Sequence, residues 1–209
     1  SRFPYYMNTY GIHSIHGRAP AVATGVAVAR PDLDVWVITG DGDALSIGGN
    51  HLIHNIRRNT DITVIVHDNQ IYGLTKGQAS PTTDPGYVTK VQTEGVVLDP
   101  LHPLEMAIAL GAGFVARGYS LDVEHLSWLI SEGIKHKFFS FIYVLQPCVS
   151  FNKRNTYEWY SKRVYKVNDD GSFNPENKMA AYEKAHEWGD RVPIGIIYRT
   201  EKETYEEKR

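Results

Sequence analysis

The sequence predicts an α/β fold in which a mostly parallel sheet is flanked by helices. Two apolar runs rich in branched residues, 35–40 and 62–66, are separated by a stretch with apolar residues at helical spacing, 43–58. This strand–helix–strand order is typical of parallel sheets, whose strands are buried on both faces. Short polar segments follow both runs, and they mark the carboxyl ends of the strands as the expected ligand-binding edge.

The remaining elements are expected to continue the alternation of strands and helices. Periodicity predicts helices over residues 20–30, 103–110, 122–134, 155–167 and 176–188, and strands over residues 114–117, 138–145 and 192–198. We expect residues 1–200 to form a single domain. Residues 201–209, dominated by Glu and Lys, are expected to form a solvated tail.

Composition excludes several classes of function. The chain has 209 residues, 42% of them hydrophobic and 22% charged, and a formal net charge of −2. Interspersed charges of both signs predict no nucleic-acid or membrane partner. The longest apolar runs, such as residues 138–145, are far shorter than the roughly 20 residues of a membrane helix. One cysteine suits a reducing compartment, so we expect a cytoplasmic protein.

Oxygen ligands follow two strands of the predicted sheet. The segment Gly40-Asp41-Gly42-Asp43 comes directly after the first strand, and Asn69 follows the second. In isolation the first segment also fits a tight turn with an aspartate helix cap. A right-handed crossover would bring Asp41 and Asn69 to neighbouring strand ends. Such a pair suits Mg²⁺ that bridges a diphosphate to the protein, whereas the glycine pattern of a dinucleotide site is absent.

Five segments of this sequence carry a specific resemblance. Gly40-Asp41-Gly42 with Asn69 resembles the diphosphate motif of thiamine-dependent enzymes, and therefore their thiamine diphosphate-binding fold. Jointly, residues 16–19, 40–44, 48–51, 71–78 and 146–152 resemble the beta subunit of 2-oxoacid:ferredoxin oxidoreductases. Residues 71–78 and 157–165 are similar to the 2-oxoglutarate type.

The resemblance implies a magnesium site and a diphosphate site. Asp41, Asn69 and the backbone carbonyl of Ile71 would be the magnesium ligands. Gly42 and Asp43 would contact the diphosphate.

The resemblance also implies contacts at the other end of the cofactor. His16 would lie on the cofactor, and Gly73 with Leu74 would line the thiazolium side. Lys76 would face the carboxylate of the substrate. From the residues alone, His16 also fits a hydrogen-bonded loop histidine, and Lys76 fits a solvated loop lysine.

Cys148 is the remaining candidate. Most lone cysteines are buried and inert. The resemblance implies instead that Cys148 is the last of four thiolate ligands of a four-iron, four-sulfur cluster. The other three ligands would come earlier, and the start at Ser1 fits a chain that begins after the third; the chain as given is not expected to hold a complete cluster.

The implied activity is the oxidative decarboxylation of a 2-oxoacid. Coenzyme A would receive the acyl group, and the cluster would pass electrons to ferredoxin. The resemblance places the glutamate that activates the cofactor on an alpha subunit, so an alpha–beta assembly is expected. Two alternatives remain: a thiamine enzyme without redox chemistry, and a scaffold fragment that binds no cofactor. Asp68, where many thiamine enzymes have Asn, and the bulky Phe138 and Tyr143 are departures from the family pattern.

Overall fold

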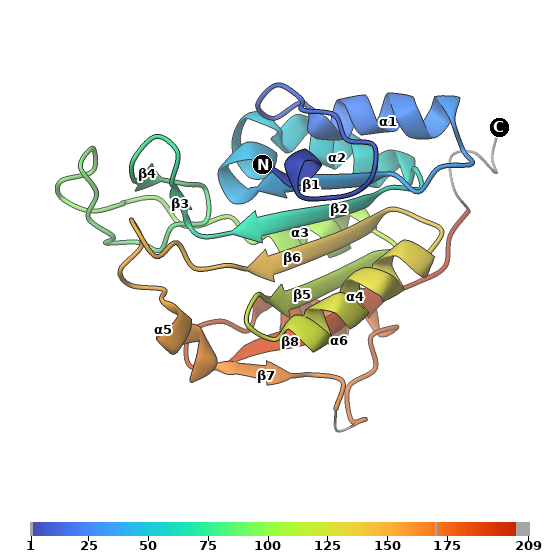
Figure 1. The fold of residues 1–209 in the computed structure, drawn as a ribbon. Helices are drawn as coiled ribbons and strands as arrows, with labels where there is room; N and C mark the ends of the chain where they lie inside the picture. The colour runs from blue at the N-terminus through green and yellow to red at the C-terminus, as the bar shows by residue number, and fades with distance from the viewer. Residues whose placement is uncertain (1, 170, 204–209) are drawn as a thin grey trace.

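A six-stranded sheet forms the centre of the computed structural model, which describes residues 2–169 and 171–203 (Figure 1). The strand order is β1-β2-β6-β5-β8-β7. The strands are β1 (Trp36–Gly40), β2 (Thr63–Asp68), β5 (Phe114–Tyr119), β6 (Ser140–Leu145), β7 (Val164–Lys166) and β8 (Val192–Arg199). Neighbouring strands are parallel except β5 and β8. The predicted mostly parallel sheet is therefore confirmed.

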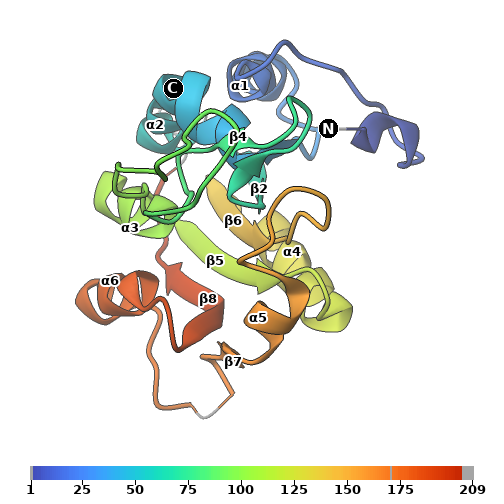
Figure 2. The ribbon, with the colours of Figure 1, turned by 90° about the vertical axis from the view of Figure 1, so that its left-hand side faces the viewer.

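Helices cover the two faces of the sheet unequally. They are α1 (Ala19–Ala29), α2 (Gly49–Arg58), α3 (Pro103–Leu110), α4 (Val123–Lys135), α5 (Tyr157–Ser161) and α6 (Lys178–His186), with a short helical turn η1 (Phe3–Tyr5) near the start. In Figure 2, α3 and α6 lie on one side of the strands and α4 on the other. The larger core packs α1, α2, α3 and α6 against the sheet, and the smaller core packs α4 against it.

Local sequence signals set most helix ends. Pro103 begins α3, where a missing backbone N–H costs nothing, and Gly111 ends it with a φ of 87° that favours glycine. The Asp122 side chain accepts a hydrogen bond from the backbone N–H of His125 and begins α4. Because these signals are local, the predicted ends of both helices agree with the structure to within a residue.

The predicted helix over residues 155–167 is wrong in its second half. The helix α5 ends at Ser161, and Val164–Lys166 form β7, which pairs in parallel with β8. The sequence favours a strand only weakly here, because three residues are too few to establish a period. The open edge of β8 supplies the missing hydrogen bonds, and that edge exists only in the folded sheet.

The predicted helix over residues 43–58 is divided in two. Asp43–Ile47 form a π-helical turn, η2, in which the backbone N–H of Gly48 donates to the carbonyl oxygen of Asp43. The helix α2 then begins at Gly49. A side chain at Gly48 would meet that carbonyl oxygen at 2.4 Å, so glycine permits the change of winding. Such turns are frequent at functional sites.

No helix in the described part of the chain is long and apolar enough to cross a membrane. In the expected tail, residues 201–203 are exposed, although Lys202 Nζ donates to the carbonyl oxygen of Gly111 and Asn59 Nδ2 donates to that of Glu203. Residues 204–209 lie outside the described residues. The division into a domain over 1–200 and a tail over 201–209 therefore stays a prediction.

Candidate active site

Three neighbouring strands end beside one another at the edge where polar residues were expected. Residue 41 follows β1, residue 69 follows β2, and residues 146–148 follow β6. Gly40 pairs with His67 across β1 and β2, and Asp68 pairs with Leu145 across β2 and β6. The parallel register therefore brings Asp41, Asn69 and Cys148 to one edge of the sheet, from segments that are far apart in the sequence.

Two buried carboxylates occupy this edge. Asp41 is 3% exposed and Asp68 is fully buried. The hydroxyl of Thr82 lies 3.1 Å from Asp41 Oδ2 and 2.7 Å from Asp68 Oδ1, so it links the two side chains. Asp68 Oδ2 is buried and has no hydrogen bond of ordinary geometry among the described residues, although the side chain of Tyr143 lies close to this carboxyl group. A buried carboxylate oxygen left in this way is costly unless a cation or a proton meets it.

The pKa values of both carboxyl groups reflect this burial. Loss of solvent raises the pKa of Asp41. Burial raises the pKa of Asp68 well above its usual range, and the negative charge of Asp41 raises it further. The arrangement is therefore one in which a bound cation would stabilise the charged forms of both groups.

The loop after β2 is held in a tight conformation. Asn69 Oδ1 accepts a hydrogen bond from the backbone N–H of Ile71 at 3.0 Å, and Asp68 Oδ1 accepts one from the N–H of Gln70 at 3.1 Å. Gln70 has a φ of 56°, in the left-handed region. The side chain of Asn152 donates to the carbonyl oxygen of Asn69 at 3.1 Å, which ties this loop to the segment after β6.

These groups fit a magnesium ion by their chemistry. Asp41 offers a carboxylate, Asn69 an amide oxygen and Ile71 a backbone carbonyl, all of them hard oxygen donors of the kind that Mg²⁺ prefers. Asp68, which shares the Thr82 hydroxyl with Asp41, is a further carboxyl group next to them. The donor set is thus compatible with the predicted metal, and the ligand roles of Asp41, Asn69 and Ile71 stay predictions.

Asp43 and His16 are brought together. His16 Nδ1 lies 2.6 Å from Asp43 Oδ1, and the same oxygen accepts a hydrogen bond from the backbone N–H of Gly17 at 2.6 Å. The hydroxyl of Thr39 donates to the other oxygen of Asp43. Because its carboxylate is already engaged, Asp43 could meet a diphosphate only through its backbone N–H. The same contacts hold the His16 loop against the strand-end edge.

Gly42 is packed closely against Tyr72. The Tyr72 hydroxyl donates to the carbonyl oxygen of Gly42 at 3.1 Å, and a Cβ at Gly42 would lie 2.2 Å from the ring. A larger residue at position 42 would therefore displace Tyr72, which belongs to the small hairpin formed by β3 (Ile71–Tyr72) and β4 (Gln78–Ala79). The close contact with Tyr72 is therefore one reason for glycine at this position, independent of any ligand.

The turn of this hairpin carries the other predicted residues. Leu74 is 95% exposed, and Lys76 is exposed with a φ of 76°. A Cβ built on Gly73 would lie 3.9 Å from Cys148 Sγ. The fold thus brings Gly73 and Cys148 together, whereas the side chains of Leu74 and Lys76 are exposed to solvent.

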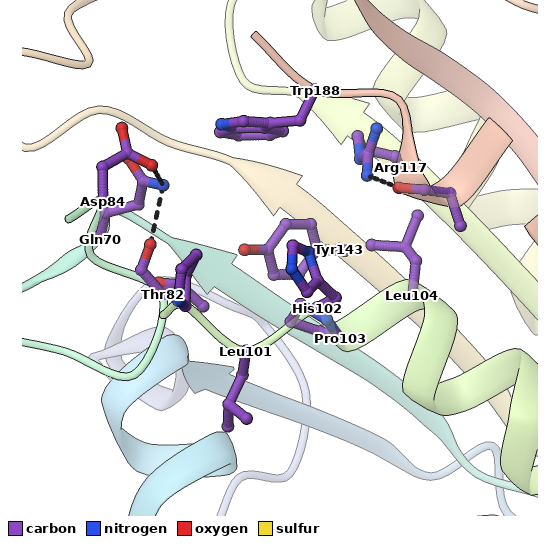
Figure 3. A pocket seen from close by; sticks show the side chains of 12 residues that line it. Gln70, Thr82, Asp84, Leu101, His102, Pro103, Leu104, Arg117, Tyr143 and Trp188 are labelled. Carbon is purple, nitrogen blue, oxygen red and sulfur yellow. Dashed lines mark hydrogen bonds between the residues drawn. The ribbon is translucent and has the colours of Figure 1, made fainter. Parts of the chain in front are cut away.

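A small cavity is lined in part by Thr82, the residue that is hydrogen-bonded to the carboxylate pair (Figure 3). The cavity has a volume of about 40 Å³, and its lining residues include Gln70, Thr82, Arg117, Tyr143 and Trp188. Gln70 Oε1 and Arg117 Nε have no hydrogen-bond partner in the described residues. A space of this size suits a few water molecules, and it is far smaller than a cofactor pocket.

Three residues that position this site had no predicted role. Thr82 connects the two carboxylates, Asn152 holds the loop after β2, and Tyr143 reaches the same buried region from β6. Burial raises the pKa of Tyr143 well above its usual range, and the charge of Asp68 adds to the shift. The polar run Thr82-Thr83-Asp84 was a signal in the sequence, but no local pattern connects it with residue 41.

Comparisons with known proteins match almost the whole chain. Residues 1–144 match the family described as thiamine pyrophosphate enzyme, C-terminal TPP binding domain. Residues 148–209 match the family that comprises the C-terminal region of pyruvate ferredoxin oxidoreductase beta subunits.

Individual relatives agree with these families. The chain is 47% identical to 2-oxoacid:ferredoxin oxidoreductase 1, subunit beta, of Aeropyrum pernix, with 100% of this chain and 69% of the relative covered. It is 48% identical to 2-oxoglutarate oxidoreductase subunit KorB of Mycobacterium tuberculosis, with 88% and 45% covered. A solved structure of 2-oxoglutarate:ferredoxin oxidoreductase from Magnetococcus marinus, with 2-oxoglutarate, coenzyme A and succinyl-CoA bound, superposes with a TM-score of 0.95 at 38% identity and covers 99% of this chain and 70% of that one.

The match to the thiamine-enzyme family, the carboxyl groups at the strand ends and the 47% identity over the whole of this chain all agree with one another. They also confirm the resemblance first noted in the five motifs. The chain belongs to the beta subunits of the 2-oxoacid:ferredoxin oxidoreductases, an enzyme family.

Proposed function

We propose that this chain is the thiamine diphosphate- and magnesium-binding subunit of a 2-oxoglutarate:ferredoxin oxidoreductase. The reaction would be the oxidative decarboxylation of 2-oxoglutarate to an acyl-coenzyme A, with electrons passed to ferredoxin. The observation that carries the proposal is the pair of buried carboxylates, Asp41 and Asp68, at adjoining strand ends, where one oxygen of Asp68 has no hydrogen bond of ordinary geometry among the described residues. This is the environment in which a divalent cation stabilises the fold and binds a diphosphate.

The chain would hold the metal and the diphosphate end of the cofactor. In this proposal Asp41, Asn69 and the carbonyl oxygen of Ile71 hold Mg²⁺. The backbone N–H groups of Gly42 and Asp43 meet the diphosphate, since the Asp43 carboxylate is turned toward His16 and Gly17. His16 would stay against the cofactor because Asp43 fixes its ring.

The hairpin and the segment after β6 would serve the reactive end. When bound, thiamine diphosphate supplies a carbon nucleophile and an electron sink for decarboxylation. Gly73 and Leu74 would line the thiazolium side, and Lys76 would pair with a substrate carboxylate. Cys148, next to Gly73, would ligate an iron–sulfur cluster. A four-cysteine cluster would need three thiolates from outside these 209 residues, which contain one cysteine.

The substrate and partner assignments are supported by the names of relatives. A Mycobacterium tuberculosis relative is named for 2-oxoglutarate, and the Magnetococcus marinus structure contains 2-oxoglutarate and coenzyme A.

An alpha subunit would complete the site. Large exposed apolar side chains near the start of the chain, Tyr5, Tyr6, Tyr10, Ile12 and Ile15, offer a surface for such a partner. A cytoplasmic location stays a prediction from the single cysteine.

The test uses the full-length protein assembled with its alpha partner. Thiamine diphosphate is titrated calorimetrically with and without Mg²⁺, and reduction of a viologen dye is then followed with 2-oxoglutarate or pyruvate. Magnesium-dependent binding and faster reduction with 2-oxoglutarate are expected. Binding without dye reduction for any 2-oxoacid would indicate a thiamine enzyme without redox chemistry. No binding would leave the scaffold alternative, and faster reduction with pyruvate would overturn only the substrate assignment.

A further inference from the structure

Two histidines flank one buried glutamate where α3 begins and α6 ends. Glu105 Oε1 lies 2.6 Å from His186 Nδ1, and Glu105 Oε2 lies 3.5 Å from His102 Nδ1. The centroids of the two imidazole rings are 5.6 Å apart. One ligand atom from each of the three side chains can be chosen so that all three lie within 4.8 Å of one another.

The burial of these side chains is graded. The side chain of Glu105 is 7% exposed, that of His102 is 49% exposed and that of His186 is 71% exposed. In the described part of the chain both ion-pair partners of Glu105 are histidines, whose charge depends on protonation. The carboxylate of Glu105 is thus almost completely removed from solvent, whereas both imidazole rings are exposed.

We propose that His102, Glu105 and His186 bind a first-row divalent transition ion, of which Zn²⁺ is the representative. Imidazole nitrogen and carboxylate oxygen are zinc ligands with bonds of about 2.0–2.2 Å, so neighbouring ligand atoms in a tetrahedral site lie about 3.3 Å apart. The two observed contacts, 2.6 and 3.5 Å, involve different oxygens of Glu105. One ligand atom from each side chain already lies within 4.8 Å of the other two, so a bound ion would draw the three atoms together. Water completes the coordination.

This donor set selects against magnesium. Mg²⁺ takes oxygen ligands, as offered by Asp41 and Asn69, whereas two imidazoles favour zinc, copper, nickel or iron. The cluster is therefore a second metal site of different selectivity. The inference does not depend on thiamine diphosphate binding, because no residue of the cluster belongs to the proposed cofactor site.

The ion would connect two distant segments of the chain next to the loop that carries Thr82. Glu105 and His186 are 81 positions apart in the sequence. The backbone N–H of Leu101 donates to the carbonyl oxygen of Pro81 at 2.8 Å, and this hydrogen bond closes the loop formed by residues 82–100. His102 follows that closure directly. A metal at this cluster would therefore fasten the base of the loop to α6.

The experiment measures zinc binding to the full-length protein in its alpha–beta complex. The iron–sulfur clusters are kept intact, and Mg²⁺ is present in excess. Calorimetric titration with Zn²⁺ is compared for the wild type, His186→Ala, His102→Gln and the matched control His54→Ala, a histidine on α2 outside the cluster. His186 is largely exposed, so its replacement leaves the fold intact. The wild type and His54→Ala are expected to bind one more zinc ion than the other two variants.

Hydrogen exchange locates the ion independently. With Zn²⁺, peptides covering residues 101–106 and 178–188 should exchange more slowly in the wild type and in His54→Ala, and at an unchanged rate in His186→Ala. Equal zinc binding by all four proteins would overturn the proposal, because the ion would then sit elsewhere. Absence of zinc binding to the wild type would overturn it too, and would leave the cluster as a hydrogen-bonded carboxylate.

Discussion

The two ends of the candidate active site differ in how completely this chain builds them. At the ends of β1 and β2, the side chains of Asp41 and Asp68 are buried and held by Thr82. At the hairpin and the segment after β6, Leu74 and Lys76 are exposed. Pre-organised, desolvated ligands are expected where a metal binds, whereas exposed apolar residues are expected where another surface completes a site. The proposed alpha–beta assembly accounts for this difference: this chain would build the metal end by itself, and a partner subunit would complete the reactive end.

The largest expected effect comes from Asp41→Ala in the assembled enzyme. The loss of a ligand should weaken magnesium-dependent binding of thiamine diphosphate by more than the 10–100-fold typical of outer-sphere substitutions, measured calorimetrically. Asp34→Ala, at an exposed aspartate, is the matched control and should bind as the wild type does. Equal affinities of the two variants would break the assignment of the metal end.

The variant Cys148→Ser should impair the reactive end of the site and leave the metal end unchanged. Serine has nearly the same size but is a poor ligand for iron, so dye reduction should fall to background while thiamine diphosphate binds with unchanged affinity. Electron paramagnetic resonance of the reduced complex checks the loss of the cluster signal. A variant that keeps its cluster and its dye reduction would show that Cys148 has no redox role.

A third prediction concerns the stability of the protein in acid, and it involves the opposite, amino-terminal ends of the strands. Burial, helped by the charge of Arg199, lowers the pKa of His136, near the amino end of β6, to about 4. Between about pH 6.5 and pH 4 the unfolded chain binds more protons than the folded one, so stability should fall as the pH falls through this window. The loss is at most on the order of 3 kcal/mol, because solvent screens part of the effect. Urea unfolding at pH 7, 5 and 4 should show a shallower dependence for His136→Gln, and parallel curves would contradict this assignment.

Gly42→Ala tests whether close packing or ligand contact requires glycine. The added methyl group would meet the Tyr72 ring at 2.2 Å, and such overpacking costs about 1–3 kcal/mol. We expect a roughly tenfold or greater loss of cofactor affinity. If the clash with the Tyr72 ring is the only cause of this loss, the double variant Gly42→Ala, Tyr72→Ala will recover the cofactor affinity. Persistence of the defect in the double variant would indicate a direct contact of residue 42 with the diphosphate.

The smallest effect is expected for Thr82→Val, which keeps the shape and removes the hydroxyl. Asp41 and Asp68 would lose the hydroxyl that they share, at about 1–3 kcal/mol, while a bound metal still satisfies their oxygens. Magnesium-dependent cofactor affinity should fall by roughly tenfold in calorimetry. Thr82→Ser should restore it, and a variant that matches the wild type would show that the link between the carboxylates is unimportant.

The sequence by itself determined the fold class and most of the elements. Branched apolar runs predicted β1 and β2, proline and glycine marked the ends of α3, and the glycine–aspartate segment after β1 indicated the ligand-binding edge. These features were readable because each depends on a local period or a local backbone restriction. The five motifs also identified the family, which the comparisons confirmed.

Only the tertiary structure decided how the distant parts meet. The partnership of Asp41, Asp68 and Thr82 arises because parallel pairing and a loop return bring together residues that no local pattern connects. The conversion of Val164–Lys166 into β7 depends on the open edge of β8. The cluster of Glu105 with His102 and His186 requires α3 and α6 to pack side by side. Each is a long-range contact whose energy exists only once the sheet has formed, and this is why the sequence alone did not predict it.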